Sequence, residues 1–154
     1  MNTKQLREAY HGYGNWIGII EELEENVKEQ KDVKKKSEIY LEIGNIWEVV
    51  FLEKSKAVTR YQDAYKLDQE NREALFLARK VYREMGKSRM VAQLANLELN
   101  LIRENQDQEI AKELFLELGE SLTDMGEVER QRSVLKSYKG YTVEIVWLRN
   151  FIRI

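Results

Sequence analysis

Residues 37–71 decide the fold, and they read SEIYLEIGNIWEVVFLEKSKAVTRYQDAYKLDQEN. In the first half of this stretch, Tyr40, Ile43 and Trp47 recur at spacings of three and four residues, which places them on one face of a helix. The second half repeats the spacing with small residues between aromatic ones, at Ala57, Val58, Tyr61, Ala64 and Tyr65. The stretch therefore predicts two consecutive amphipathic helices.

Small residues occupy the positions at which these two helices would face each other. Gly44 lies on the apolar face of the first helix, and Ala57 and Ala64 lie on the apolar face of the second. Small side chains let two helix backbones approach closely, and neighbouring aromatic rings then fill the remaining space. We therefore expect a tightly packed helical hairpin.

Segments with the same periodicity lie on both sides of this hairpin, and two of them end at a glycine, Gly86 and Gly126, able to close a helix. The chain has no proline and only eight glycines, which suits helices joined by short turns. An all-α fold follows. The further helices are expected over residues 16–27, 75–85, 90–101 and 109–125, with a weaker one after Glu127 and a short one over residues 6–10.

The chain also resembles itself at a fixed spacing. The segment EIYLEIG at residues 38–44 aligns with ELFLELG at residues 113–119, 75 positions later. The pattern Tyr10-x3-Gly14 recurs as Tyr82-x3-Gly86, 72 positions later. Both separations are close to two copies of a unit of about 34 residues, a length typical of stacked helix pairs.

These motifs resemble the tetratricopeptide repeat family, whose first helix carries aromatic-x2-Leu-Gly-x2-Tyr and whose second carries Ala-x3-Phe/Tyr-x2-Ala. The best unit here is Tyr40-x2-Ile43-Gly44-x2-Trp47 followed by Ala57-x3-Tyr61-x2-Ala64. The resemblance covers residues from about 6 to 138 and implies a right-handed α-solenoid of antiparallel helix pairs, about four in all, filling residues 1–138.

Other units depart from the family pattern. The unit that begins at Phe115 has Gln131 where a small alanine is expected. The unit that contains Tyr82 has Arg79 at the glycine position and Val91 at the alanine position. No unit supplies the proline that commonly ends a repeat, because Gln69 stands there in the best one.

The resemblance implies a concave groove lined by the first helix of each pair. Relatives that grip a terminal carboxylate use basic and asparagine side chains at these positions, whereas here three of them are Leu41, Phe76 and Leu116. We therefore expect an apolar and acidic groove suited to an amphipathic or basic segment. An equal alternative is that these three residues pack against neighbouring repeats. The groove residues are Glu38, Leu41, Asn45, Glu48, Glu73, Phe76, Lys80, Arg83, Glu113, Leu116, Glu120 and Thr123.

Composition argues against several functional classes. Hydrophobic residues make up 43% of the chain and charged residues 34%, so we expect a soluble protein with a buried apolar core. The net charge of −2 argues against a nucleic-acid-binding surface. His11 is the only histidine and cysteine is absent, so we expect no catalytic triad, metal site or cofactor, and no enzyme. Without a signal peptide or a spanning segment, we expect a cytoplasmic protein with no membrane partner.

Residues 139–154 fall outside the repeat pattern. They are rich in β-branched and aromatic residues and fit either a strand or a buried helix. Such a segment could cap the last hairpin, insert into the groove, pair with a second copy, or mark a longer array. The first functional hypothesis is thus a non-enzymatic scaffold that binds a peptide or protein partner in its groove. The alternative is a self-assembling structural protein that forms a homo-oligomer through residues 139–154.

Overall fold

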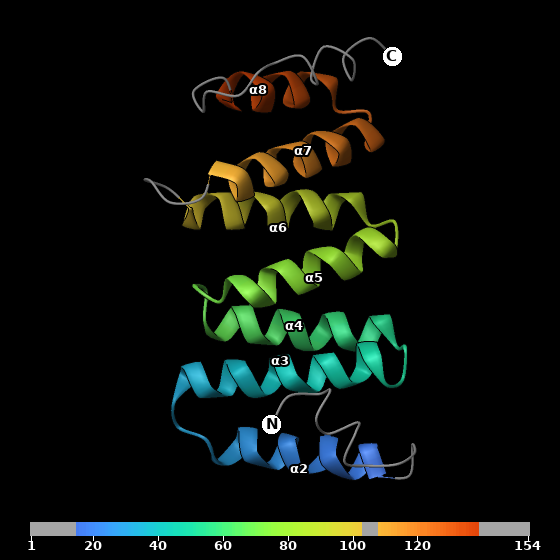
Figure 1. Cartoon of the computed structure of the whole chain (residues 1–154), viewed down its shortest axis with the longest axis vertical. Helices are drawn as coiled ribbons and strands as arrows, with labels where there is room; N and C mark the ends of the chain where they lie inside the picture. Colours follow the sequence, from blue (N-terminus) through green and yellow to red (C-terminus); the bar gives the residue numbers. More distant parts are fainter. Residues whose placement is uncertain (1–14, 103–107, 139–154) are drawn as a thin grey trace. The chain divides into compact units, whose positions relative to one another are not determined.

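The computed structural model describes residues 15–102 and 108–138, and every regular element in these ranges is a helix (Figure 1). The all-α expectation is therefore confirmed for this part of the chain. The bounds are α2 Trp16–Glu29, α3 Val33–Val49, α4 Lys54–Leu67, α5 Arg72–Glu84, α6 Ser88–Leu101, α7 Gln108–Asp124 and α8 Val128–Tyr138.

The chain divides into two compact units, Met1–Met85 and Gly86–Ile154. The first unit contains α2 to α5, and the second contains α6 to α8.

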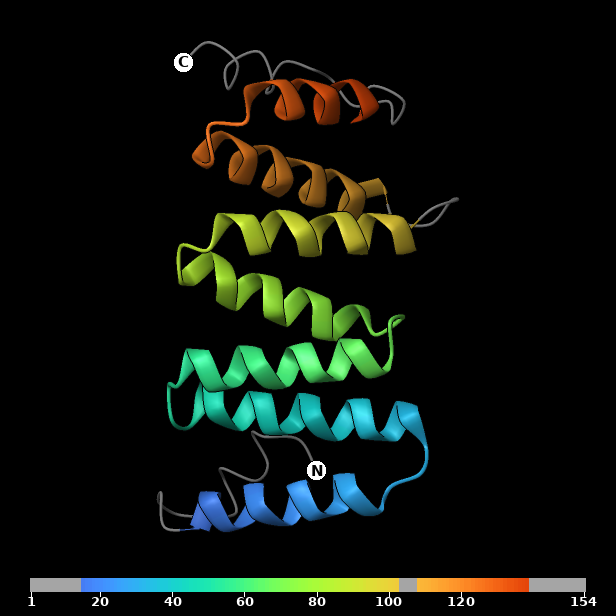
Figure 2. The ribbon, with the colours of Figure 1, turned by 180° about the vertical axis from the view of Figure 1, so that it is seen from behind.

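In the first unit, the helices pack in chain order, with α2 against α3, α3 against α4, and α4 against α5 (Figure 2). Between α2 and α3 the core consists of large apolar side chains spaced one helical turn apart, as expected for facing amphipathic helices. The buried members are Trp16, Ile20, Val27, Ile43, Ile46 and Val50.

The α3–α4 hairpin is packed around a glycine, as the sequence predicted. A Cβ atom at Gly44 would lie 2.5 Å from Cε1 of the Tyr61 ring and 3.2 Å from the Ala57 carbonyl oxygen. Ala57, Tyr61 and Ala64 are all fully buried. Only a residue without a side chain fits at position 44 while the Tyr61 ring keeps its place.

A buried polar chain joins three helices of the first unit. The Ser37 hydroxyl, fully buried, donates to the Ala64 carbonyl at 2.8 Å and accepts from Asn71 Nδ2 at 2.7 Å. Asn71 is also the N-cap of α5, where its Oδ1 accepts from the Ala74 amide at 3.0 Å. The Asn71 side chain thus connects the start of α5 to the start of α3, and through Ser37 to the end of α4.

In the second unit, α6 packs against α7 and α7 against α8. The buried apolar core between the first two helices consists of Ala92, Ala95, Leu114, Leu118 and Leu122. Gly126 follows α7 with φ +71° and Gly86 follows α5 with φ +69°. Both glycines therefore close helices in the left-handed conformation that the sequence predicted for them.

The expected helices over residues 16–27, 75–85, 90–101 and 109–125 are all present, and the weaker one after Glu127 is α8. Residues 6–10 and 139–154 lie outside the described residues, so the short first helix and the apolar tail stay predictions. The boundary at 138 between a repeat domain and a tail likewise stays a prediction. No helix in the described ranges combines the length and apolar character needed to cross a bilayer.

Candidate functional site

The first unit presents one helical face that carries exposed apolar and charged side chains together. We call it the α3–α5 face. At helical spacing it is formed by Glu38, Glu42, Asn45 and Val49 of α3 with Glu73, Phe76, Lys80 and Arg83 of α5. Phe76 is 50% exposed and Val49 45% exposed, although both are large and apolar. An apolar surface rimmed by polar residues marks a candidate binding surface.

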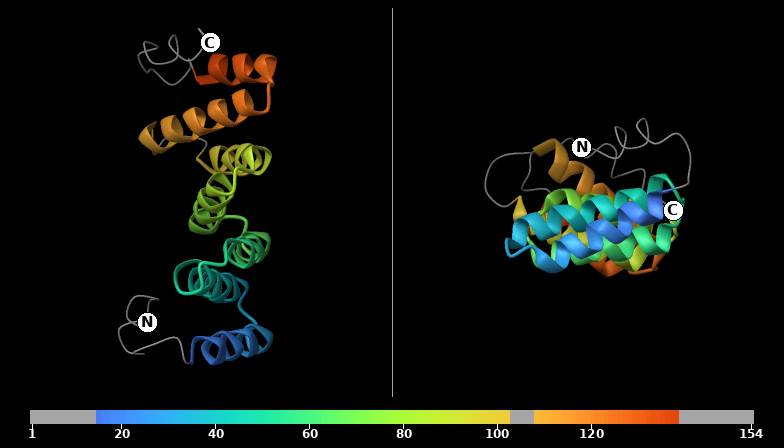
Figure 3. Two further views of the ribbon diagram at one scale, coloured as in Figure 1. Left: turned by 90° about the vertical axis from the view of Figure 1, so that its right-hand side faces the viewer. Right: turned by 90° about the horizontal axis from the view of Figure 1, so that it is seen from below.

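The two helices of this face run parallel and are connected at two levels. Near their first turns, Asn71 Nδ2 donates to Ser37 Oγ at 2.7 Å. Further along, Lys80 Nζ donates to Glu48 Oε1 at 2.7 Å. The side view shows α3 and α5 on one side of the first unit and α4 on the other (Figure 3, left). The face therefore has a fixed register between its two helices.

The Glu48 carboxylate is the centre of a polar network beneath the face. The Tyr61 hydroxyl of α4 lies 2.6 Å from Glu48 Oε2 and 2.9 Å from Asn45 Oδ1, so its single proton is directed at these two acceptors. The other Glu48 oxygen accepts from Lys80. Three helices thus converge on one carboxylate whose side chain is only 11% exposed.

Burial and charge shift the acidities of this network. Burial, and then the hydrogen bond to Glu48, raise the pKa of Tyr61 well above its ordinary value, so this phenol stays neutral. The hydrogen bond to Glu48 raises the pKa of Lys80, which therefore stays cationic. Tyr61 and Lys80 are thus held as hydrogen-bond donors, which suits a structural connection between helices.

The exposed part of the face contrasts with this network. Glu38, Glu42 and Glu73 form no ion pair or hydrogen bond with any side chain in residues 15–102 and 108–138. Burial raises the pKa of Glu42, because its carboxylate is partly withdrawn from water. The Arg79 guanidinium lies 5.6 Å from the Phe76 ring centre, a cation–π contact that holds the exposed ring in position.

The predicted groove residues of the first unit lie partly on the exposed α3–α5 face and partly in the polar network beneath it. Glu38, Glu73, Phe76, Lys80 and Arg83 are exposed. Asn45 and Glu48 are half-buried and accept from Tyr61. Leu41 is 8% exposed, so its side chain packs inside the unit.

Sequence reasoning missed Glu42 and Val49, which the structure places on the same face. The repeat pattern pointed to positions 38, 41, 45 and 48. Helical spacing alone, with steps of four, three and four residues from Glu38, leads to Glu42, Asn45 and Val49 instead. It also missed the hydroxyl of Tyr61, whose ring was predicted only as a core residue.

The remaining predicted groove residues belong to α7 in the second unit. Glu113 and Thr123 are exposed, whereas Leu116 and Glu120 are half-buried. Thr123 is part of a local hydrogen-bonded chain, because its hydroxyl donates to the Gly119 carbonyl at 2.8 Å and accepts from Gln131 Nε2 at 2.7 Å. The structure does not place these four residues relative to the α3–α5 face.

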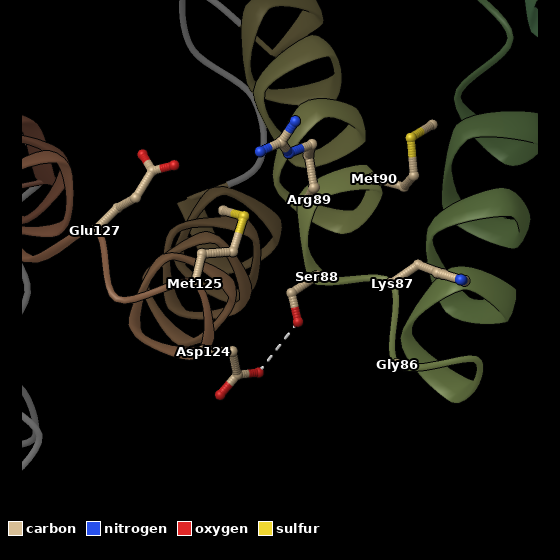
Figure 4. A pocket seen from close by; sticks show the side chains of 8 residues that line it. All are labelled: Gly86, Lys87, Ser88, Arg89, Met90, Asp124, Met125 and Glu127. Carbon is tan, nitrogen blue, oxygen red and sulfur yellow. Dashed lines mark hydrogen bonds between the residues drawn. The ribbon is translucent and has the colours of Figure 1, made fainter.

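The second unit has an open hollow of about 570 Å³ where α6 begins and α7 ends (Figure 4). Side chains of both charge signs line it, including Arg89 and Glu127, and the Ser88 hydroxyl donates to Asp124 Oδ2 at 3.3 Å. A serine bonded directly to a carboxylate, with no imidazole between them, lacks the arrangement that activates a nucleophile. We therefore do not assign a reaction to this hollow.

Within the described ranges, no three histidine or acidic side chains come close enough together to hold a metal ion. His11 lies outside those ranges. A scan of known protein families finds no match to this chain, and a search of curated proteins finds no relative.

Proposed function

We propose that this protein is a non-enzymatic interaction scaffold that binds a peptide or protein partner on the α3–α5 face. The observation that carries the proposal is the exposed Phe76 ring, held by Arg79 on a helix that is itself fixed to α3 through Glu48 and Lys80. A preorganised apolar side chain loses little freedom on binding, and such residues make effective anchors for a partner.

We also propose that the helix pairs form a right-handed solenoid similar to tetratricopeptide repeats. Two features of the first unit support a repeat of this kind. The hydrogen bond between Ser37 and Asn71 joins residues 34 positions apart, the length of one such repeat. Gly44 and Tyr61 meet as the motif residues of the two helices of one pair. In such an array, the parallel α3 and α5 would be the helices that line the concave surface.

Site-specific photo-crosslinking in cells tests the binding proposal. A benzophenone amino acid replaces Phe76 in the full chain, and a matched variant carries it at Val33, which is 48% exposed at the first turn of α3 and lies off the face. We expect a discrete protein adduct at position 76 and none at position 33, identified by mass spectrometry. No adduct at position 76, or the same adducts at both positions, would contradict the proposal.

A further inference from the structure

The α3–α5 face has a distribution of charge that indicates the chemistry of its partner. The Ser37–Asn71 and Glu48–Lys80 contacts fix the register of the two helices. Glu42 and Phe76 are each five residues beyond the first of these contacts, so they lie at the same level along parallel helices. Glu38 and Glu73 lie closer to that contact, about one turn earlier. The exposed ring therefore has carboxylates beside it and before it.

The cations of the same face do not neutralise these three carboxylates. Lys80 pairs with Glu48, and Arg79 is buried with its guanidinium over the Phe76 ring. Arg83 lies beyond Lys80, at the C-terminal end of α5. Glu38, Glu42 and Glu73 thus place three carboxylates without a side-chain partner among the described residues around Phe76, and cationic side chains of a partner would pair with them.

We propose that the α3–α5 face binds a basic, amphipathic peptide segment, in which an apolar side chain covers Phe76 and cationic side chains on either side of it pair with Glu38, Glu42 and Glu73. This inference rests on the proposed function and specifies its partner. An acidic segment would be repelled by the same three carboxylates. A neutral apolar segment would leave Glu38, Glu42 and Glu73 without a cationic side chain to pair with.

A binding titration with defined probes tests this chemistry in the full chain. The first probe is a fluorescent twelve-residue helical peptide of lysine and leucine only. In the second probe every lysine is replaced by glutamate, and in the third every leucine is replaced by serine. We expect saturable binding of the first probe, measured by fluorescence anisotropy, and at least tenfold weaker binding of the other two. Equal binding of the serine probe would show general charge attraction only and would overturn the proposal.

Matched variants locate the binding. The triple change Glu38→Gln, Glu42→Gln and Glu73→Gln should weaken the lysine–leucine probe about tenfold, with a larger loss at low salt than at high salt. Its control is Glu21→Gln, Glu22→Gln and Glu29→Gln on α2, which removes the same charge from exposed positions of the same unit. The control should change affinity less than twofold. An equal loss in both triple variants would overturn the proposal.

Phe76→Ala should weaken the same probe about fivefold or more, whereas Ile17→Ala, at a residue 48% exposed on α2, should leave it unchanged. Circular dichroism should show that each variant keeps its helical content. An unchanged affinity in Phe76→Ala would contradict the proposed anchor. If photo-crosslinking at position 76 captures a partner while the lysine–leucine probe does not bind, the binding function stands and the basic chemistry is refuted.

Discussion

The first helices of the α3–α4 and α7–α8 hairpins contain nearly the same sequence, EIYLEIG at residues 38–44 and ELFLELG at residues 113–119. The glycines that end these two segments nevertheless have different surroundings. Gly44 faces the fully buried Tyr61 ring, and a Cβ there would lie 2.5 Å from it. A Cβ at Gly119 would meet no atom of the described residues within 4 Å. The same motif glycine is therefore a packing requirement in one hairpin, whereas in the other no described residue opposes a side chain at its position.

The second helices of the two hairpins differ in a related way. In each hairpin, a donor on the second helix reaches the side chain that stands four residues after the motif glycine. Tyr61 reaches Glu48 in the first, and Gln131 reaches Thr123 in the second. The first hairpin combines a buried ring with this polar contact, whereas the second has the polar contact in place of a small alanine. Packing against the neighbouring helix, and not the motif alone, therefore sets the role of each position.

The largest difference between the hairpins should appear when both glycines become alanine. Gly44→Ala forces the Tyr61 ring out of a filled core, and we expect it to lower the free energy of unfolding by about 1–3 kcal/mol. Gly119→Ala gains helix propensity without a clash and should raise it by about 0.5–1 kcal/mol. Urea denaturation followed by circular dichroism measures both.

A double variant then separates packing from propensity. With Tyr61→Leu in the background, the ring atoms that oppose position 44 are gone, so Gly44→Ala should cost clearly less than it does in the original chain. Equal costs in the two backgrounds would mean that the ring is not what requires glycine. The contrast between the two hairpins would then lose its physical basis.

The next largest effect concerns the polar chain at the start of α3. Ser37→Ala removes the acceptor of Asn71 Nδ2 and the donor to the Ala64 carbonyl, both in a buried place, and should cost about 1–3 kcal/mol. Lys112 stands at the aligned position of the second hairpin and is half-buried. Lys112→Ala should change stability by less than about 0.5 kcal/mol, and a comparable loss in both variants would contradict the assigned role of Ser37.

The sequence alone predicted the helices and the close approach at Gly44, because hydrophobic periodicity and small residues are local signals. It did not reveal that Ser37 and Asn71 meet, since a serine and an asparagine 34 positions apart are both ordinary surface residues in a sequence pattern. It also left open whether Leu41 lines the groove or packs against a neighbouring helix, and the structure buries this side chain. Which side of a helix faces water depends on the neighbouring helices, and that information is not local.

The Tyr61 hydroxyl should make a smaller, pH-dependent contribution. Its pKa is raised in the folded state, so its stabilising effect is complete below the unfolded value of about 10 and is lost as the pH rises above it. Tyr61→Phe should cost about 1 kcal/mol at pH 7. It should also make stability fall less steeply above about pH 10, although Tyr65, Tyr82 and Lys80, whose pKa values are raised as well, keep part of the slope. An unchanged slope in urea titrations between neutral and alkaline pH would show that Tyr61 is not a source of this dependence.

The smallest effect should come from the polar contact of the second hairpin. Gln131→Ala removes the donor to Thr123, but Thr123 is exposed, so water replaces the lost bond and the cost should be about 0.5 kcal/mol. The same change introduces the small residue that the repeat pattern expects at this position. Amide hydrogen exchange in α8 measures the outcome. Faster exchange would mean that Gln131 is the main connection between α7 and α8. Slower exchange would instead mean that a small residue alone lets this hairpin close as tightly as α3–α4, and the difference between the hairpins would then come from one side chain.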